Sequence, residues 1–509
     1  MGENDIKNIV IVGGGKAGWM SAALLSKTLG KKLKIKLIES DGISTVGVGE
    51  TTIPPFKLFN NIIGLNEDEF LKSCKGTFML GTQFKDWGEV GEKYLHAYGA
   101  LGRNVGFIHF YQYWLRSQKE GNQTDIWSYS KNAQAAMMGK FSRQSSGDGA
   151  TQPDLSYAFH FDAKLYAAFL RDFCEKAGVE RIEGKVVDTN LRAKDGFIES
   201  VVMENGDVIE GDMFIDCTGF KAVLIEGALK TGYENWNQWL PCNKGVIVPS
   251  ENTGPLPPYT EATAQSAGWQ WRIPLQHRTG NGHIYCSELM SDDEAAAILN
   301  KNLKGKPLSD PTSIKFTTGR RNKFWNKNCL AIGWSASFLE PLESTSVHLI
   351  QSGIVKLISL FPDKGFSQIN IDEYNRQAIT ELEGIRNFLI LHYKTSRRTD
   401  SPFWKKCQEM KIPVDLANKI KLFKDTGRIF HEDQELFTEA GWLQIMLGQG
   451  LKPQTYHPLA NMLTTEQLTE YMTNIEQITK DAVDTMPAHD EFIAKNCTAE
   501  KDKARYVVT

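Results

Sequence analysis

The first hydrophobic residues of the chain form an uninterrupted run, Ile9-Val10-Ile11-Val12. A run without polar alternation is typical of a parallel strand that is covered on both faces. Residues 16–29 then place hydrophobic side chains at helical spacing, and Leu33 to Glu39 forms a second apolar segment. The pattern predicts a βαβ unit at the start of the chain.

Later segments carry similar strand and helix signals. We expect a helix from Asp162 to Ala177 and a buried strand from Met213 to Asp216. The segment Cys329 to Gly333 repeats the pattern of an apolar strand followed by glycine. We expect these strands, together with Val186 to Thr189 and Phe197 to Met203, to rejoin the first sheet.

Two aromatic-rich stretches separate these segments, at about residues 56–155 and 232–315. We interpret them as insertions that build a substrate compartment beside the sheet. From residue 366 to 509, polar and apolar residues alternate at helical spacing, and prolines interrupt the pattern. The predicted organisation is a discontinuous nucleotide-binding module, residues 1–365, followed by a helical cap, residues 366–509.

The composition is that of an ordinary globular enzyme. The 509 residues are 41% hydrophobic and 23% charged, with a net charge of −3, and a chain of this length exceeds one compact core. The balanced charge provides no basic surface for nucleic acid. No apolar stretch is long enough to span a membrane. We therefore expect a cytoplasmic protein that binds neither nucleic acid nor a membrane.

The cysteines are scattered and include no C-x-x-C pair. Their spacing argues against a metal site, and a chain of this size needs no disulfides. We predict that they are reduced packing residues and that the protein binds no metal. They are Cys74, Cys174, Cys217, Cys242, Cys286, Cys329, Cys407 and Cys497.

A glycine-rich turn follows the first predicted strand. In this G-x-G-x-x-G pattern Gly13 permits a tight turn, Gly15 lets the backbone approach a pyrophosphate, and Gly18 lets helix and strand pack closely. The N–H groups of the helix that begins at Lys16 and Ala17 would bind that anion. Glu39, about twenty residues on, can accept hydrogen bonds from ribose hydroxyls. Together these features predict a dinucleotide site.

Two later turns favour FAD over NAD as the dinucleotide. An apolar strand that contains Asp216 ends in the small-residue turn Cys217-Thr218-Gly219, and Ala331-Ile332-Gly333-Trp334 is a second return of this kind. We expect Asp216 and Trp334 to lie at the cofactor. The predicted fold class is α/β: a doubly wound, Rossmann-like FAD-binding sheet domain with an inserted substrate region and a helical C-terminal cap.

Four blocks make a family resemblance specific. The chain resembles flavin-dependent halogenases of the tryptophan-halogenase type, whose motifs include G-W-x-W-x-I-P and F-L-E-P-L-E-S-T. The matching blocks are Gly268 to Pro274, Val46 to Pro54, Phe338 to Ser346, and His392-Tyr393-Lys394 followed by Pro402-Phe403-Trp404.

The resemblance implies a reaction and its cofactors. In this family reduced FAD and oxygen oxidise a halide ion to hypohalous acid, which halogenates an electron-rich, indole-like or tryptophan-like ring. Since the chain carries no reductase domain, FADH2 would come from a separate flavin reductase. The resemblance also implies that Gly49, Thr51, Val186 and Val347 lie at the flavin.

The resemblance assigns further roles near the substrate. Thr345 and Ser346 fall where the family binds halide through backbone groups, although the second position is usually glycine. Glu343 falls at the carboxylate that assists the reaction at the ring. His96 and Tyr98 fall where the family holds the substrate ring between side chains. Alternatively, Glu343 is an ordinary paired glutamate, and His96 and Tyr98 are packing residues.

Trp269 and Trp271 belong to the G-W-x-W-x-I-P block. Their spacing places both side chains on one face of a strand, where they could simply be core aromatics. In the family that the chain resembles, they form the wall of the tunnel between flavin and substrate. Such a wall would keep oxygen from passing directly to the organic substrate.

Met79 is a departure from the family, whose catalytic lysine would stand at this position within Gly76-Thr77-Phe78-Met79-Leu80-Gly81. Methionine has a similar length but lacks the ammonium group. Three explanations of Met79 stay open. It is an engineered replacement, it reflects a natural loss or change of activity, or Lys75 or Lys85 takes over the role of the lysine. Strand alternation would put both lysines on the side of Met79, but several residues away.

Two other functions compete with halogenation. A flavin monooxygenase that hydroxylates an aromatic substrate would explain Met79, but the two tryptophans argue against it. A non-catalytic FAD-binding homologue is the second alternative, against which Glu343 and the halide loop argue. The sequence leaves open the aromatic substrate, the ring position, the halide and the oligomeric state, with a homodimer among the options.

Overall fold

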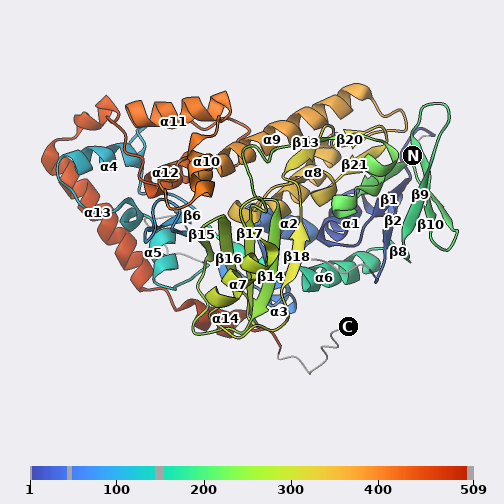
Figure 1. The fold of residues 1–509 in the computed structure, drawn as a ribbon, viewed down its shortest axis with the longest axis horizontal. Coiled ribbons are helices and arrows are strands. Elements are labelled where there is room, and N and C mark those ends of the chain that lie inside the picture. The colour runs from blue at the N-terminus through green and yellow to red at the C-terminus, as the bar shows by residue number, and fades with distance from the viewer. Residues whose placement is uncertain (1–2, 43–46, 48, 144–153, 501–509) are drawn as a thin grey trace.

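The computed structural model describes residues 3–42, 47, 49–143 and 154–500. A six-stranded sheet lies at one end of the molecule (Figure 1). Its first elements, β1 (Asn8–Val12), α1 (Lys16–Leu29) and β2 (Lys34–Glu39), confirm the predicted βαβ unit. The strand order is β20-β21-β12-β1-β2-β8, in which all but β20 are parallel. The other strands are β8 (Glu180–Glu183), β12 (Met213–Asp216), β20 (Trp325–Asn326) and β21 (Cys329–Ala331).

Helices cover the buried strands of this sheet. α1 contacts both α6 (Ala163–Lys176) and α8 (Ser346–Ser359). α6 begins where the sequence predicts, because the Asp162 side chain accepts hydrogen bonds from two N–H groups of its first turn. β1 is buried along Ile9 to Val12, as expected for a strand with both faces covered.

The expectation that all later strands rejoin this sheet is wrong for two of them. β9 (Val186–Leu191) and β10 (Ile198–Met203) pair with β11 (Val208–Glu210) in a separate antiparallel sheet. β9 is largely exposed, so it lacks the two-sided cover that a parallel strand needs. The position beside β2 is taken instead by β8.

A seven-stranded sheet occupies the centre of the molecule (Figure 1). It draws strands from both aromatic-rich stretches, in the order β18-β14-β17-β16-β15-β5-β6. These strands are β5 (Gly81–Lys85), β6 (Lys93–Ala97), β14 (Lys244–Ser250), β15 (Thr260–Gln265), β16 (Gly268–Pro274), β17 (Thr279–Tyr285) and β18 (Thr312–Lys315). Two smaller sheets comprise β3 (Glu50–Thr51), β7 (Ala158–Phe161) and β4 (Thr77–Met79), and β13 (Tyr233–Asn235), β19 (Gly319–Arg321) and β22 (Ser337–Phe338).

Helices dominate the C-terminal part of the chain. α9 (Gln368–Lys394) contacts β20 and α8 beside the parallel sheet, and α10 and α12 further along. The helices after it are α10 (Pro402–Glu409), α11 (Val414–Thr426), α12 (Glu439–Gly448), α13 (Thr465–Asp484) and α14 (His489–Asn496). Those of the inserted stretches are α2 (Phe56–Ile63), α3 (Glu67–Ser73), α4 (Phe110–Lys119), α5 (Lys131–Met137) and α7 (Asp292–Asn302). In Figure 1, α11, α12 and α13 lie at the end opposite the parallel sheet.

All eight cysteines are buried and free, which confirms their predicted role as packing residues. Within the described ranges, every helix is too short or too polar to cross a bilayer. The boundary at residue 365 stays a prediction.

Candidate active site

The predicted nucleotide turn connects β1 to α1. Gly13 adopts a φ of 111°, which favours glycine, and its N–H donates to the carbonyl oxygen of Ile38 at 2.8 Å. A Cβ on Gly18 would overlap the carbonyl oxygen of Gly13, whereas a Cβ on Gly15 would meet nothing within 4 Å. No side chain caps the N-terminus of α1, so its first N–H groups can bind an anion. The turn therefore fits the pyrophosphate of a dinucleotide.

Side chains from several segments gather beside this turn. Lys16 forms an ion pair with Glu50 of β3, and its ammonium lies 5.7 Å from the centre of the Trp334 ring. Trp334 stacks on Phe220 with ring centres 4.8 Å apart. Ala17 follows Lys16 in the first turn of α1. The structure thus brings Lys16 and Trp334 together, as expected of two residues at one site.

Glu39 stands at the end of β2 and already has protein partners. Its Oε1 accepts a hydrogen bond from Arg181 Nε at 2.5 Å, and its Oε2 accepts one from Trp19 Nε1 at 3.2 Å. The backbone oxygen of Glu39 accepts a hydrogen bond from the N–H of Gly184. This contact brings the segment that leads into Val186 to the end of β2, although β9 itself belongs to another sheet.

Asp216 acts within its own turn. Its buried carboxylate accepts hydrogen bonds from the N–H groups of Leu224 and Ile225, each at 2.8 Å, and from that of Thr218 at 3.0 Å. These bonds hold the chain after β12 in place. A cofactor contact from this segment would therefore come from the turn rather than from the Asp216 side chain.

The remaining predicted cofactor residues lie in neighbouring elements. Gly49 lies against Ile273 of β16, and Thr51 pairs with His160 across β3 and β7. Val347 is fully buried in the first turn of α8. Within the predicted block Val46 to Pro54, residues 46 and 48 fall outside the described residues.

A cavity of about 1020 Å³ lies between β6 and the C-terminal helices. His96 and Tyr98 both line it, as alternate residues that share a side of the chain. The start of α12 and Ile475 and Ile478 of α13 close other sides. Ligand pockets typically measure roughly 300–1,000 Å³, so this cavity can hold an aromatic molecule larger than a single indole ring.

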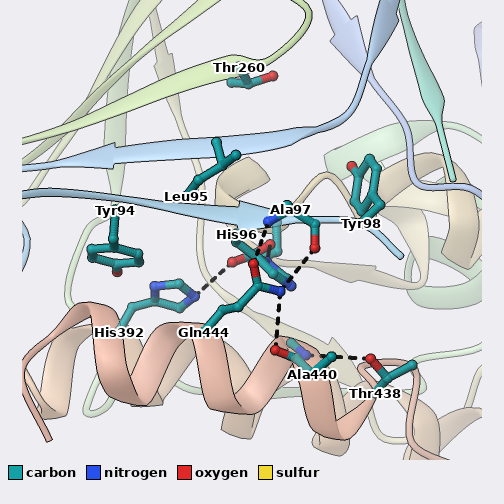
Figure 2. A network of polar contacts seen from close by, with 12 residues as sticks. Tyr94, Leu95, His96, Ala97, Tyr98, Thr260, His392, Thr438, Ala440 and Gln444 are labelled. Carbon is teal, nitrogen blue, oxygen red and sulfur yellow. Dashed lines mark hydrogen bonds and ion pairs between the residues drawn. The ribbon is translucent and has the colours of Figure 1, made fainter. Parts of the chain in front are cut away.

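Glu343 is a buried carboxylate that two imidazoles contact. His96 Nδ1 lies 2.8 Å from Glu343 Oε2, and His392 Nε2 lies 2.8 Å from Glu343 Oε1. The three side chains come from β6, α9 and the short helix η6 (Pro341–Glu343), and Figure 2 shows the two rings close together. Burial would raise the pKa of Glu343, but the two imidazoles outweigh it and lower the pKa to about 2. Glu343 is therefore ionised at neutral pH.

His96 stands between Glu343 and the cavity. His96 is among the residues that line the cavity, whereas Glu343 is not. His392 is completely buried, and burial lowers its pKa. The arrangement therefore connects a buried carboxylate to the cavity through His96.

α12 packs directly against this part of β6. The Gln444 amide accepts a hydrogen bond from the N–H of Ala97 and donates one to the carbonyl oxygen of Ala97, both at 3.0 Å (Figure 2). One turn earlier, a Cβ on Gly441 would lie 2.9 Å from His96 Nε2. Glycine at this position therefore leaves room for the imidazole.

Met79 is fully buried at the end of β4. Two hydroxyl groups point at its sulfur: Tyr98 Oη at 3.6 Å and Thr260 Oγ1 at 3.8 Å. Because Tyr98 also lines the cavity, Met79 lies directly behind the cavity wall. The thioether thus occupies a place with polar neighbours.

Neither nearby lysine follows the predicted alternation. Lys75 precedes β4 and has a φ of 52°, and Lys85 lies in β5, which belongs to a different sheet from β4. The Lys85 ammonium lies 3.0 Å from the Glu261 carboxylate. The expectation that one strand carries Lys75, Met79 and Lys85 is wrong, because the chain changes sheets at Gly81, whose φ is 156°.

Trp269 and Trp271 lie side by side on β16, with ring centres 5.9 Å apart. Trp269 is fixed by a 2.8 Å hydrogen bond from its Nε1 to Glu340, which also accepts one from Tyr393 Oη at 2.5 Å. Farther along this face of β16, Ile273 contacts Gly49. The strand therefore extends from the predicted flavin loop to the Glu340 turn.

The predicted halide residues follow Glu343 directly. Ser344 has a φ of 60° and ends η6, Thr345 is the N-cap of α8, and Ser346 is its first residue. Thr345 is only 2% exposed. The turn thus places backbone groups of the α8 N-terminus next to Glu343 in the chain.

The site includes residues that the sequence did not identify. His392 was recognised only within a family block, and neither Glu340, Gln444 nor Gly441 was singled out. The adjacent pair His392-Tyr393 is the signal in the sequence that could have pointed to these residues. In the structure Tyr393 donates a hydrogen bond to Glu340, and His392 contacts Glu343.

Comparison with known proteins finds matches over nearly the whole chain. Residues 8–465 match the sequence profile described as tryptophan halogenase. Among solved structures, a flavin-dependent halogenase from Xanthomonas campestris is 42% identical with a TM-score of 0.95, over 98% of this chain and 100% of that chain. BrvH, a flavin-dependent halogenase from Brevundimonas sp. BAL3, is 41% identical with a TM-score of 0.93, over 97% and 99%.

A curated relative extends the comparison to sequence. The tryptophan 6-halogenase ThaL from Streptomyces albogriseolus is 32% identical over 493 residues, which cover 90% of this chain and 92% of ThaL. The structural similarity confirms the predicted fold class, a Rossmann-like FAD-binding fold with a helical C-terminal region.

Proposed function

This chain belongs to the tryptophan halogenase family, and from this premise we propose that it attaches a halogen to an electron-rich aromatic ring such as an indole. The observation that carries the proposal is the ionised Glu343, which reaches a large cavity through His96. A carboxylate with a histidine partner can stabilise positive charge and move a proton during substitution on a ring.

FAD is the cofactor that we assign to the glycine turn. Gly13, Gly15, Gly18 and the N-terminus of α1 would hold its pyrophosphate, and Lys16 would lie near it. When bound in reduced form, FAD supplies the electrons with which oxygen oxidises a halide ion to hypohalous acid. A separate flavin reductase would provide FADH2, as expected for flavin-dependent halogenases.

The halide would lie at the turn formed by Thr345 and Ser346. Backbone N–H groups suit a halide because they donate hydrogen bonds without a compact charge. Ser346 adds a Cβ and a hydroxyl at a position where the family usually has glycine, so we expect a halide pocket of altered size. Trp269 and Trp271 would then separate the flavin from the aromatic ring.

The substrate class follows from the cavity and the relatives. ThaL is named for halogenating tryptophan, and aromatic and apolar residues line the cavity of this chain, including Phe110, Tyr111 and Phe437. We propose an indole or a molecule that carries one. The eight free, buried cysteines fit a reducing compartment, which supports a cytoplasmic location.

The proposal is tested with purified protein, FAD, NADH, a flavin reductase, bromide and indole. Mass spectrometry is expected to detect brominated indole that requires both FAD and bromide. Hydroxylated indole formed without halide would instead identify a monooxygenase. Absence of any halide-dependent oxidant or product, with FAD bound, would identify a non-catalytic FAD-binding protein.

A further inference from the structure

Position 79 lacks a proton donor, but the cavity beside it contains one. We propose that His96, paired with Glu343, is the acid that activates hypohalous acid at the aromatic ring. This inference rests on the proposed halogenation and assigns to His96 a chemical role beyond holding the ring.

His96 lies where it can reach both Glu343 and a ligand in the cavity. Among the described residues, His96 both lines the cavity and contacts the Glu343 carboxylate, at 2.8 Å. Met79 lies behind the same wall, where Tyr98 contacts its sulfur. A small oxidant that entered the cavity near Tyr98 would therefore meet His96, two residues away along the chain.

The two imidazoles at Glu343 differ in their access to the cavity. Glu343 is ionised and contacts both His96 and His392. His392 is fully buried, so its neutral form is favoured. Of the two rings in contact with Glu343, His96 is therefore the one from which a proton can reach a ligand in the cavity.

The His96 ring is oriented with one nitrogen towards the carboxylate. Nδ1 of His96 faces Glu343, which leaves Nε2 as the atom that can serve a ligand. Nε2 lies beside Gly441, whose missing side chain gives it space. Other titratable groups near the site are Tyr94 on β6, Tyr98 directly after β6, His392 on α9, and the His109–Glu439 pair in the cavity wall.

The chemical step balances without another reagent. As the ring forms its bond to the halogen, the oxygen–halogen bond of hypohalous acid breaks, and Nε2–H of His96 gives its proton to the departing oxygen, which leaves as water. The halogenated ring then loses its own proton to Nε2, which restores both the aromatic ring and the imidazolium. Glu343 is a positioning residue that holds Nδ1–H and stabilises the charge.

The test compares the wild type with His96→Gln and with His348→Gln as a matched control. His348 also contacts a carboxylate, Glu381, at 2.8 Å, but it lies outside the cavity. His96→Gln is expected to lower the rate of indole bromination about 100-fold, in the range of general acid–base catalysis. Formation of hypobromous acid, trapped with monochlorodimedone, should be unchanged, and His348→Gln should match the wild type in both assays.

The assays separate this inference from the proposed function. If the wild type forms no bromide-dependent oxidant, halogenation itself fails as the function. If oxidant forms but His96→Gln brominates indole as fast as the wild type, the role of His96 is wrong.

A second variant covers the case in which His96→Gln fails to fold. Glu343→Gln removes the carboxylate that holds Nδ1–H of His96, so it should lower the rate of indole bromination and leave formation of hypobromous acid unchanged. NMR of histidine labelled with ¹⁵N should show the Nδ1–H of His96 hydrogen-bonded in the wild type and a shifted Nδ1 signal in Glu343→Gln. The same Nδ1 signal in both proteins would overturn the inference.

Discussion

Met79 is a residue whose surroundings suit a polar group better than a thioether. Tyr98 and Thr260 direct hydroxyl groups at its sulfur, and both could accept hydrogen bonds from a lysine ammonium. We predict that Met79→Lys raises the rate of indole bromination roughly tenfold, the effect of one added hydrogen bond from a charged donor. The measurement is brominated product relative to hypobromous acid trapped in a parallel assay.

Met79→Leu is the control for this substitution, since it keeps the apolar volume and adds no donor. Its rate should equal that of the wild type. Equal rates for the lysine and leucine variants would mean that position 79 does not reach the path of the oxidant.

Glu340 is a second residue whose environment has a measurable consequence. Burial raises its pKa to about 7, although Tyr393 and Trp269 donate hydrogen bonds to it. Since the pKa of Glu340 in the folded protein lies above the ordinary value of 4.5, the contribution of protonated Glu340 to the free energy of unfolding is complete below pH 4.5. It is lost as the pH rises through about 7, where a buried charge forms.

We therefore predict that Glu340→Gln reduces the loss of stability between pH 4.5 and pH 8. The rise in the pKa of Glu340 from 4.5 to about 7 corresponds to about 3 kcal/mol in the free energy of unfolding. Urea unfolding of both proteins across this pH range measures the difference. Parallel pH curves for Glu340→Gln and the wild type would show that Glu340 does not titrate as described.

At the scale of elements, two glycines of the β1–α1 turn differ in the space around them, and we expect different roles for them. A Cβ at Gly18 would overlap Gly13, whereas a Cβ at Gly15 would face open space. Gly18→Ala should therefore lower the melting temperature of the protein without ligand by several degrees, since the overlap forces α1 from β1.

Gly15→Ala should leave that melting temperature unchanged and weaken FAD binding about tenfold, because the Cβ would occupy the approach of the pyrophosphate. Flavin fluorescence titration gives the affinity of each variant. If Gly15→Ala binds FAD as tightly as the wild type, the pyrophosphate does not lie against this turn.

Elements with a strong local signal were predictable from the sequence. The Ile9 to Val12 run specified β1, and Asp162 marked the start of α6 through its capping side chain. The sheet to which a strand belongs was not predictable, because partners are chosen by contacts between distant segments. β9 has strand propensity but an exposed surface, and the chain changes sheets at Gly81 after only three residues of β4.

At the scale of the whole molecule, the candidate site is assembled from distant parts of the chain. His96 and Glu343 are 247 residues apart in the sequence, and His392 comes from a third element, α9. The three side chains meet only because α9 and α12 contact each other and α12 packs on β6. Family motifs identified Glu343 and His96 individually. Their mutual contact, and the shielding of Glu343 by His96, could not be read from spacing, since each depends on how the helical cap sits on the central sheet.

The cavity between the central sheet and the C-terminal helices should favour substrates larger than indole. Its volume of about 1020 Å³ exceeds what an indole ring fills, so indole alone leaves apolar wall in contact with water. An uncharged apolar chain at C3 of indole that buries about 60 Å² more apolar surface would make the free energy of binding more favourable by ~1.5 kcal/mol. We predict a KM roughly tenfold below that of indole, measured by steady-state bromination with a constant supply of FADH2.

Ile478 of α13 provides the matching variant, because it lines the cavity. Ile478→Trp would fill the space that the C3 chain needs, so the ratio of the two KM values should fall towards one. A ratio that stays near ten in Ile478→Trp would mean that the substituent leaves the cavity by another side. A ratio near one already in the wild type would mean that the helical cap closes on the indole alone, and that the volume beyond it takes no part in binding.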